Sequence, residues 1–99
     1  MASFVVETYV PQGDPECFAS DVDGIRVASE AIVVVDGCVH HVRSYLVRSD
    51  EMGFHFLDAE TAEDVVRVTE MAGIEVERIV EAIGVGPGRA VDGRTEGGR

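Results

Sequence analysis

The alternation of apolar and polar residues divides the chain into short strands and two helices. Residues 3–10 are rich in β-branched and aromatic side chains, which is typical of a strand. Residues 39–48 and 53–59 show the same bias on either side of a short polar turn, and residues 78–85 form the last such run. We therefore expect four strands, with the middle two joined as a hairpin that carries all three histidines of the chain.

Two segments with helical spacing lie between these strands. Apolar side chains at intervals of three and four residues predict a helix from residue 14 to about residue 32, with Asp14 as its N-cap. A second helix is expected to begin after Thr61, whose side chain caps it, and to end at Gly73. Gly53, in the turn of the hairpin, is expected to take a positive φ.

The order β-α-β-β-α-β is the split βαβ, or ferredoxin-like, plan of an α+β domain. In this plan a four-stranded antiparallel sheet has the order 4-1-3-2, and both helices cover the same face. We predict one such domain over residues 1–86 and a disordered tail, rich in Gly and Arg, over residues 87–99. The other, partly apolar face of the sheet is expected to pair with a second copy, as in dimeric α+β barrels.

Side chains of a strand alternate between the two faces of a sheet, so each residue can be assigned to a face. In the hairpin we place Val42, Ser44 and Leu46 under the helices. Phe54 and Phe56 are given the same side. The opposite, helix-free face then carries six groups capable of chemistry, which are Glu7, His41, Arg43, Tyr45, His55 and Glu81.

Charge and cysteine content limit the possible partners and compartments. The net charge of −11 argues against nucleic acid and anionic membrane surfaces, because both are bound through Lys and Arg. No apolar run approaches the ~18 residues that a membrane span needs, and the N-terminus lacks the basic start of a signal peptide. Cys17 and Cys38 have no CxxC spacing, so we expect reduced thiols in a cytoplasmic protein.

Several interpretations fit the six polar groups on the helix-free face. In the simplest, an antiparallel sheet turns this face to water and needs no further role. If the face is enclosed, Arg43 pairs with Glu7 or Glu81, because an unpaired buried charge is costly. The histidines with a carboxylate could also bind a divalent metal, since imidazole suits nickel, zinc and copper. The same groups could instead line a small-molecule pocket with an acid–base pair.

Four phrases of the chain, VVETYVP, VHHVRSYLV, FHFLDAETAEDV and GIEVERIVEA, carry a resemblance to a known family. On these phrases the chain resembles a group of small bacterial ferredoxin-like proteins of unknown function, one branch of which is described as nickel-binding. His41 stands where the family usually has tryptophan, and His55 where it often has cysteine. The resemblance implies a dimeric ferredoxin-like protein that binds metal and has no established reaction. The residues that fit the family pattern are Val39, Ser44, Tyr45, Ala59, Gly73, Ile79 and Glu81.

These observations lead to a first expectation and two alternatives. We expect a cytoplasmic homodimer, paired through its sheet face, that binds nickel or another divalent transition metal. Its metal ligands are expected to be Glu7, His41, His55 and Glu81, with Arg43 and Tyr45 contacting a bound small molecule. One alternative is a small isomerase or cofactor-free oxygenase of the dimeric α+β-barrel type, in which His55 or His41 acts as general base and Arg43 or Tyr45 orients an anionic or phenolic substrate. The other is a structural or regulatory dimer with a filled interface and no ligand.

Overall fold

Four antiparallel strands form one sheet in the order β2-β3-β1-β4, which confirms the predicted ferredoxin-like plan. The structure, a computed structural model, describes residues 1–35 and 38–84, so the expected disordered tail lies outside the described residues. None of the helices within these ranges is long and apolar enough to cross a membrane. The elements are β1 (Ala2–Tyr9), η1 (Pro11–Gly13), α1 (Pro15–Val35), β2 (Val39–Val47), η2 (Arg48–Asp50), β3 (Met52–Ala59), α2 (Ala62–Ala72) and β4 (Arg78–Ala82).

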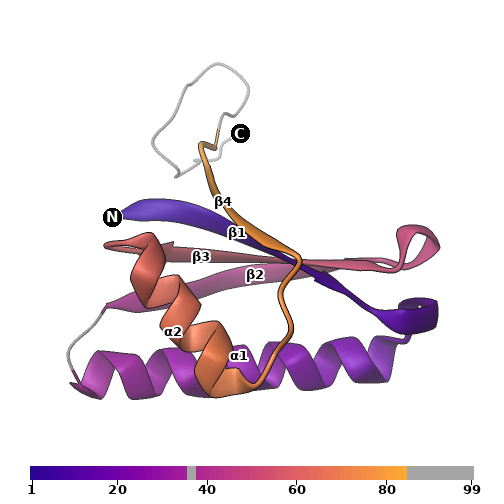
Figure 1. Ribbon diagram of the computed structural model, residues 1–99, viewed down its shortest axis with the longest axis horizontal. Helices are drawn as coiled ribbons and strands as arrows, with labels where there is room; N and C mark the ends of the chain where they lie inside the picture. The colour runs from indigo at the N-terminus through magenta and orange to yellow at the C-terminus, as the bar shows by residue number, and fades with distance from the viewer. Residues whose placement is uncertain (36–37, 85–99) are drawn as a thin grey trace, which may run out of the picture.

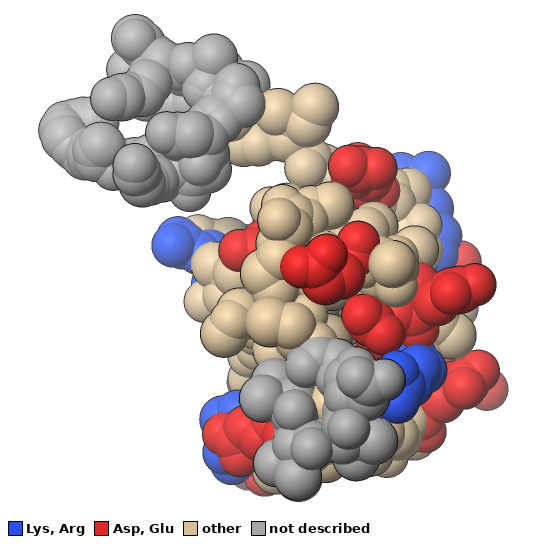
Figure 2. Space-filling view, turned by 90° about the vertical axis from the view of Figure 1, so that its left-hand side faces the viewer, with Lys and Arg blue, Asp and Glu red and all other residues tan. Residues whose placement is uncertain are grey.

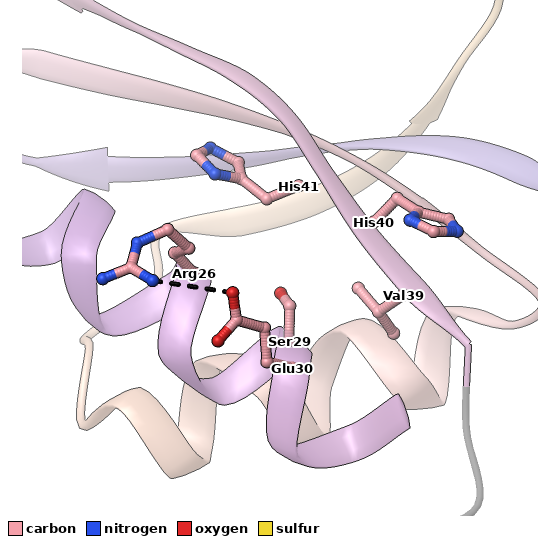
Figure 3. A pocket seen from close by; sticks show the side chains of 6 residues that line it. All are labelled: Arg26, Ser29, Glu30, Val39, His40 and His41. Carbon is pink, nitrogen blue, oxygen red and sulfur yellow. Dashed lines mark ion pairs between the residues drawn. The ribbon is translucent and has the colours of Figure 1, made fainter. Parts of the chain in front are cut away.

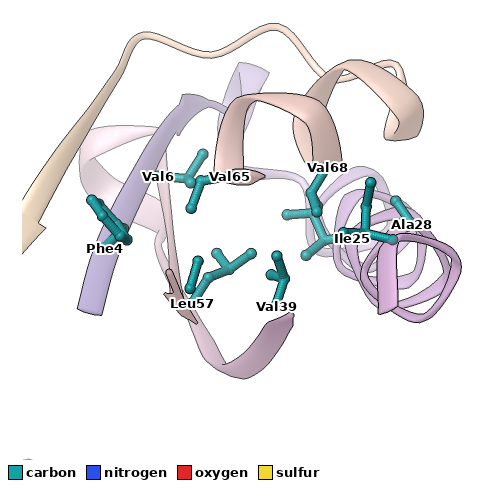
Figure 4. Packing of buried hydrophobic residues seen from close by; sticks show 10 residues of the cluster. Phe4, Val6, Ile25, Ala28, Val39, Leu57, Val65 and Val68 are labelled. Atoms are coloured by element: carbon teal, nitrogen blue, oxygen red, sulfur yellow. The ribbon is translucent and has the colours of Figure 1, made fainter. Parts of the chain in front are cut away.

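Both helices lie on the same side of the sheet (Figure 1). The hydrophobic core fills the space between them and the sheet, with side chains from β1, β3, α1 and α2 pointing toward one another (Figure 4). Burying one Val, Leu or Ile side chain stabilises the fold by roughly 1.5–3 kcal/mol, so this layer dominates the stability of the domain. The core residues are Phe4, Val6, Ile25, Ala28, Ile32, Val39, Leu57, Ala59, Val65 and Val68.

The helix ends confirm the predicted capping residues. The Asp14 carboxylate accepts a hydrogen bond from the Glu16 backbone N–H at 3.0 Å. The Thr61 hydroxyl accepts one from the Asp64 N–H at 3.2 Å, and Gly73 ends α2 with a φ of 73°. Each side-chain cap is worth roughly 0.5–2 kcal/mol of stability.

The hairpin turn differs from the prediction, because Glu51 rather than Gly53 takes the positive φ, at 56°. Glu51 is held there by the backbone, since the Val10 N–H donates to its carbonyl oxygen at 2.7 Å. Its carboxylate also accepts the Gln12 backbone N–H at 2.7 Å. Gly53 is instead needed for space: an added Cβ would lie 2.8 Å from both the Phe18 ring and the Thr8 hydroxyl oxygen.

A β-bulge interrupts the pairing of β2 with β3 between His41 and Arg43. Before the bulge His41 pairs with Leu57, and after it Arg43 pairs with Phe56. The extra residue is Val42, which is 48% exposed. The bulge places His41 and Ser44 on the same face, although three residues separate them along the strand.

The predicted faces are correct for β1 and for β2 from Arg43 onward, and wrong elsewhere. His55 pairs with Val6, a core residue, so His55 faces the helices and Phe54 and Phe56 face away. In β4, Ile79 pairs with the core residue Val6 and faces the helices, so Val80 faces away from them. Hydrophobicity favoured the two phenylalanines for the core, but on the helix side of β3 the Phe18 ring lies against Gly53 and stacks on His55.

Gly53→Ala is expected to lower the free energy of unfolding by about 1–3 kcal/mol, because the new methyl group overlaps Phe18 and Thr8. Gly24→Ala in α1 is the matched control, since its Cβ would meet Ala72 only at 3.4 Å and alanine favours helix by up to about 1 kcal/mol. Urea unfolding of both variants provides the measurement. Equal stabilities for the two variants would contradict the packing described at Gly53.

Candidate functional site

Three polar side chains meet on the helix-covered face of the sheet. The Ser44 hydroxyl oxygen lies 2.8 Å from His41 Nε2 and 2.7 Å from His55 Nδ1. His41 and Ser44 come from either side of the bulge in β2, and His55 comes from the neighbouring strand β3, where it pairs directly with Ser44. One hydroxyl group therefore joins two imidazoles in a continuous hydrogen-bonded unit.

His55 is the buried end of this unit, with no exposed surface. The Phe18 ring of α1 stacks on its imidazole, with ring centroids 5.2 Å apart and an angle of 21° between the planes. Within the described part of the chain, His55 Nε2 has no hydrogen-bond partner. An unpartnered buried N–H is rare in proteins, so we assign the proton of the neutral ring to Nδ1, where it is donated to Ser44.

Both imidazoles are held neutral at pH 7. Burial and, to a smaller extent, the neighbouring His41 together lower the pKa of His55 to about 4. Burial also lowers the pKa of His41, which a hydrogen bond to the Arg43 backbone partly opposes. A neutral imidazole keeps one lone pair, so the unit is able to accept a proton or bind a metal ion.

A groove of about 350 Å³ lies between α1 and β2, and both His40 and His41 are among the residues that line it (Figure 3). Its rim carries Arg26 and Glu30, whose charged groups are 3.5 Å apart. Its wall includes Ser29, which is only 4% exposed and whose hydroxyl has no partner among residues 1–35 and 38–84. A buried hydroxyl without a partner leaves a hydrogen bond that a bound molecule can make.

The structure separates the predicted metal ligands onto two faces. His41 and His55 lie together, but under the helices rather than on the helix-free face, which corrects the prediction. Glu7 is on the helix-free face, where its carboxylate pairs with Arg78 at 3.1 Å. Glu81 pairs with Phe4 and therefore lies on the helix side of edge strand β4, with its side chain exposed. The two carboxylates thus cannot complete a site with the two imidazoles.

No three side chains of His, Cys, Asp or Glu gather closely enough to hold a metal ion within the ranges that the structure describes. Arg43 and Tyr45 lie on the helix-free face as predicted, and the Arg43 guanidinium donates to the Tyr45 hydroxyl at 3.3 Å. That face also exposes about half of Tyr9 and Tyr45. Pairing of two copies through it stays a prediction.

Sequence reasoning missed Ser44, Ser29, Arg26 and Glu30 as site residues. Ser44 looked like a small residue packed under a helix, because an unbroken strand would put it and His41 on opposite faces. A prediction that allowed one bulge in β2 would have placed Ser44 and His41 on the same face. Ser29, Arg26 and Glu30 follow the helical spacing of α1, but only the packing of α1 beside β2 makes them a groove wall.

The molecule presents many acidic side chains to solvent. Figure 2 shows Asp and Glu spread over one end of the molecule, with fewer Arg side chains among them. This agrees with the net charge of −11. Anionic ligands are therefore disfavoured electrostatically, and neutral or cationic ones are not.

Comparisons with known proteins support the fold. The chain is similar to a crystal structure of SCO4226 from Streptomyces coelicolor A3(2), with a TM-score of 0.68 and 18% sequence identity. The match covers 82% of this chain and 95% of that protein. No family model and no curated protein matches the chain. At this level of identity the likeness establishes the shared ferredoxin-like fold alone.

The buried imidazole of His55 is expected to make the fold sensitive to acid. A histidine in the unfolded chain titrates near pH 6.5, whereas folding lowers the pKa of His55 to about 4. Between these values the unfolded chain binds the extra proton, so this contribution to stability is complete above about pH 6.5 and is lost as the pH falls toward 4. The shift corresponds to about 3 kcal/mol.

Urea unfolding of the wild type and of His55→Gln, each measured between about pH 7 and pH 4, isolates this contribution, because the many carboxylates titrate equally in both proteins. The stability of the wild type should fall more steeply. His40→Gln, a change at an exposed histidine, should keep the wild-type slope. Parallel curves for the wild type and His55→Gln would contradict the assignment.

Proposed function

We propose that this protein binds a small, uncharged polar organic molecule in the groove between α1 and β2. The observation that carries the proposal is the Ser29 hydroxyl, which is buried in the groove wall and unpartnered within the described residues. Leaving such a hydroxyl unbonded costs roughly 1–3 kcal/mol, and a ligand oxygen or nitrogen would recover that cost. The groove volume of about 350 Å³ is at the lower end of the range for small-molecule sites.

Neutral His41 supports proton exchange with the bound molecule. His41 lines the groove together with His40, and His41 connects through Ser44 to the buried imidazole of His55. A proton taken up at His41 can be accommodated by rearranging the two hydrogen bonds of the Ser44 hydroxyl. This supports the isomerase-like alternative, in which a phenol or an enolisable carbonyl compound gives up a proton to a histidine.

Titration with 4-nitrophenol tests the groove directly, because this probe is small, is phenolic and changes colour on losing its proton. We expect chemical-shift changes in the amide NMR spectrum to centre on Ser29, Arg26 and His41. Ser29→Ala should weaken binding roughly tenfold, the value of about one hydrogen bond, without lowering the free energy of unfolding. Ser20→Ala, at an exposed serine of the same helix, serves as control.

Shift changes scattered over the surface, or equal affinity in the wild type and Ser29→Ala, would rule out the groove as the binding site. Binding without a change in the phenolate absorbance would instead limit the function to binding without proton transfer. The two readouts therefore separate recognition of the molecule from the chemistry of His41.

A second candidate function is the binding of a divalent transition metal by His41 and His55. Two neutral imidazole nitrogens approach one oxygen atom, so they lie at most the sum of 2.8 and 2.7 Å apart. An ion that binds both nitrogens at about 2.1 Å needs them about 3–4 Å apart, which a small side-chain movement could provide. Glu7 and Glu81 do not belong to this smaller site, and water would supply the remaining ligands.

Calorimetric titration of the untagged protein with Ni²⁺ and Zn²⁺ tests this candidate. Replacing both imidazoles, in His41→Ala/His55→Ala, should abolish binding or weaken it at least tenfold, because each metal–imidazole bond is lost. His40→Ala is the control, since His40 is exposed and pairs with Asp58, on the opposite face of the sheet from His41 and His55. Unchanged affinity in the double variant would exclude this pair as the metal site.

A further inference from the structure

The rim of the groove between α1 and β2 carries two opposite charges side by side. Arg26 and Glu30 both line the groove, and Arg26 Nη1 lies 3.5 Å from Glu30 Oε2 (Figure 3). A charge-assisted hydrogen bond between such groups is normally about 2.7–2.9 Å long. The pair therefore leaves part of its hydrogen-bonding capacity unused, and each group can bond to a molecule in the groove.

The helix fixes the relative positions of these two groups. Arg26, Ser29 and Glu30 are spaced by three and four residues, so they lie on one face of α1. The other terminal nitrogen of Arg26, Nη2, donates to the Asp23 carboxylate at 2.6 Å. This hydrogen bond holds the guanidinium in place and leaves Nη1 toward Glu30. The rim therefore presents one donor and one acceptor at a set spacing.

A donor beside an acceptor selects against ions of either sign. A carboxylate that approaches Arg26 is repelled by Glu30, and an ammonium group that approaches Glu30 is repelled by Arg26. A neutral group with a hydrogen-bond acceptor next to a donor bonds to both residues without repulsion. The edge of a cis amide is such a group, because its carbonyl oxygen and its N–H point the same way and its oxygen and nitrogen lie about 2.2 Å apart.

The spacing of the rim suits this edge. Two hydrogen bonds of about 2.9 Å that leave amide atoms about 2.2 Å apart reach protein atoms 3.5 Å apart if each bond tilts outward by about 13°. That tilt keeps both hydrogen bonds within the favoured angular range, above about 150°. A trans amide, as in a peptide backbone, points its carbonyl oxygen and its N–H in opposite directions and cannot bond to both groups.

We propose that the groove recognises a cis amide, the group found in small lactams and cyclic ureas. Its carbonyl oxygen accepts a hydrogen bond from Arg26 Nη1, and its N–H donates to Glu30 Oε2. The methylene groups of a lactam ring suit Val39, the apolar residue of the groove lining. This inference rests on the proposed binding role of the groove, and it assigns the specificity of the groove to two residues of α1.

Amide NMR titrations with 2-piperidone, N-methyl-2-piperidone and cyclohexanone test this assignment. Of these probes 2-piperidone has the N–H, N-methyl-2-piperidone keeps only the amide carbonyl, and cyclohexanone lacks the N–H without an added methyl group. We expect 2-piperidone to bind with chemical-shift changes centred on Arg26, Ser29 and Glu30. The other two molecules should bind roughly tenfold more weakly, the value of one hydrogen bond to a charged group that water also reaches.

Three variants separate the two contacts, and all replace side chains that are more than half exposed. In Glu30→Ala the three molecules should bind with similar affinity, whereas Glu30→Gln should keep part of the preference because its carbonyl oxygen still accepts. Arg26→Ala should weaken the binding of all three, since each has a carbonyl oxygen. Glu70→Ala is the control, because Glu70 is exposed on α2 and its loss changes the net charge by the same amount as Glu30→Ala.

Equal affinity of the wild type for 2-piperidone and N-methyl-2-piperidone would overturn the proposal, as would a preference that survives in Glu30→Ala. These outcomes are separate from failure of the groove. If 4-nitrophenol binds at Ser29 and 2-piperidone does not bind, the binding role stands and the amide specificity falls. If neither molecule binds, both fall. If 2-piperidone shows the expected preference and Ser29→Ala leaves its affinity unchanged, the amide specificity stands and Ser29 is not its anchor.

Discussion

Two short hydrogen bonds to the hydroxyl of Ser44 allow this small domain to hold a fully buried histidine beneath its first helix. Removing a polar ring from water costs several kcal/mol of folding free energy unless its polar atoms are hydrogen-bonded. The Ser44 hydroxyl forms a hydrogen bond with His55 Nδ1 and another with His41 Nε2. The stacked Phe18 ring closes the remaining side of the imidazole. The position of α1 over the sheet and the absence of a side chain at Gly53 both follow from this arrangement, because Phe18 fills the space in which a Cβ of residue 53 would lie.

The same arrangement separates two kinds of polar group across the sheet. Imidazoles and a hydroxyl lie under the helices, where burial keeps the imidazoles neutral. Charged groups lie on the opposite face, where Glu7 is already paired with Arg78 and Arg43 contacts Tyr45. Neutral lone pairs in a sheltered site suit proton exchange and recognition of polar molecules, whereas paired surface charges contribute little to either. The neutral polar groups described here therefore lie between β2 and α1, beside the groove that Ser29 and His41 line.

The bulge in β2 is a small local change with a large effect on this site. An uninterrupted strand would turn His41 toward the helix-free face and leave Ser44 and His55 with one hydrogen bond between them. The one extra residue, the exposed Val42, moves each preceding side chain of β2 to the opposite face of the sheet. Expulsion of a valine to solvent is compensated by two gains: Val39 enters the core, and His41 reaches both Ser44 and the groove.

The sequence by itself determined the order of the elements, the sheet topology, the helix caps at Asp14 and Thr61, and the positive φ of Gly73, because each of these depends on local periodicity or on a few adjacent residues. It also indicated that two of the three histidines of the hairpin, His41 and His55, share one face of the sheet. Which face holds them was decided only by the tertiary structure. The side of a strand that enters the core depends on the register set by a bulge and on the shape of the space under Phe18, and both arise from contacts between residues far apart in the chain.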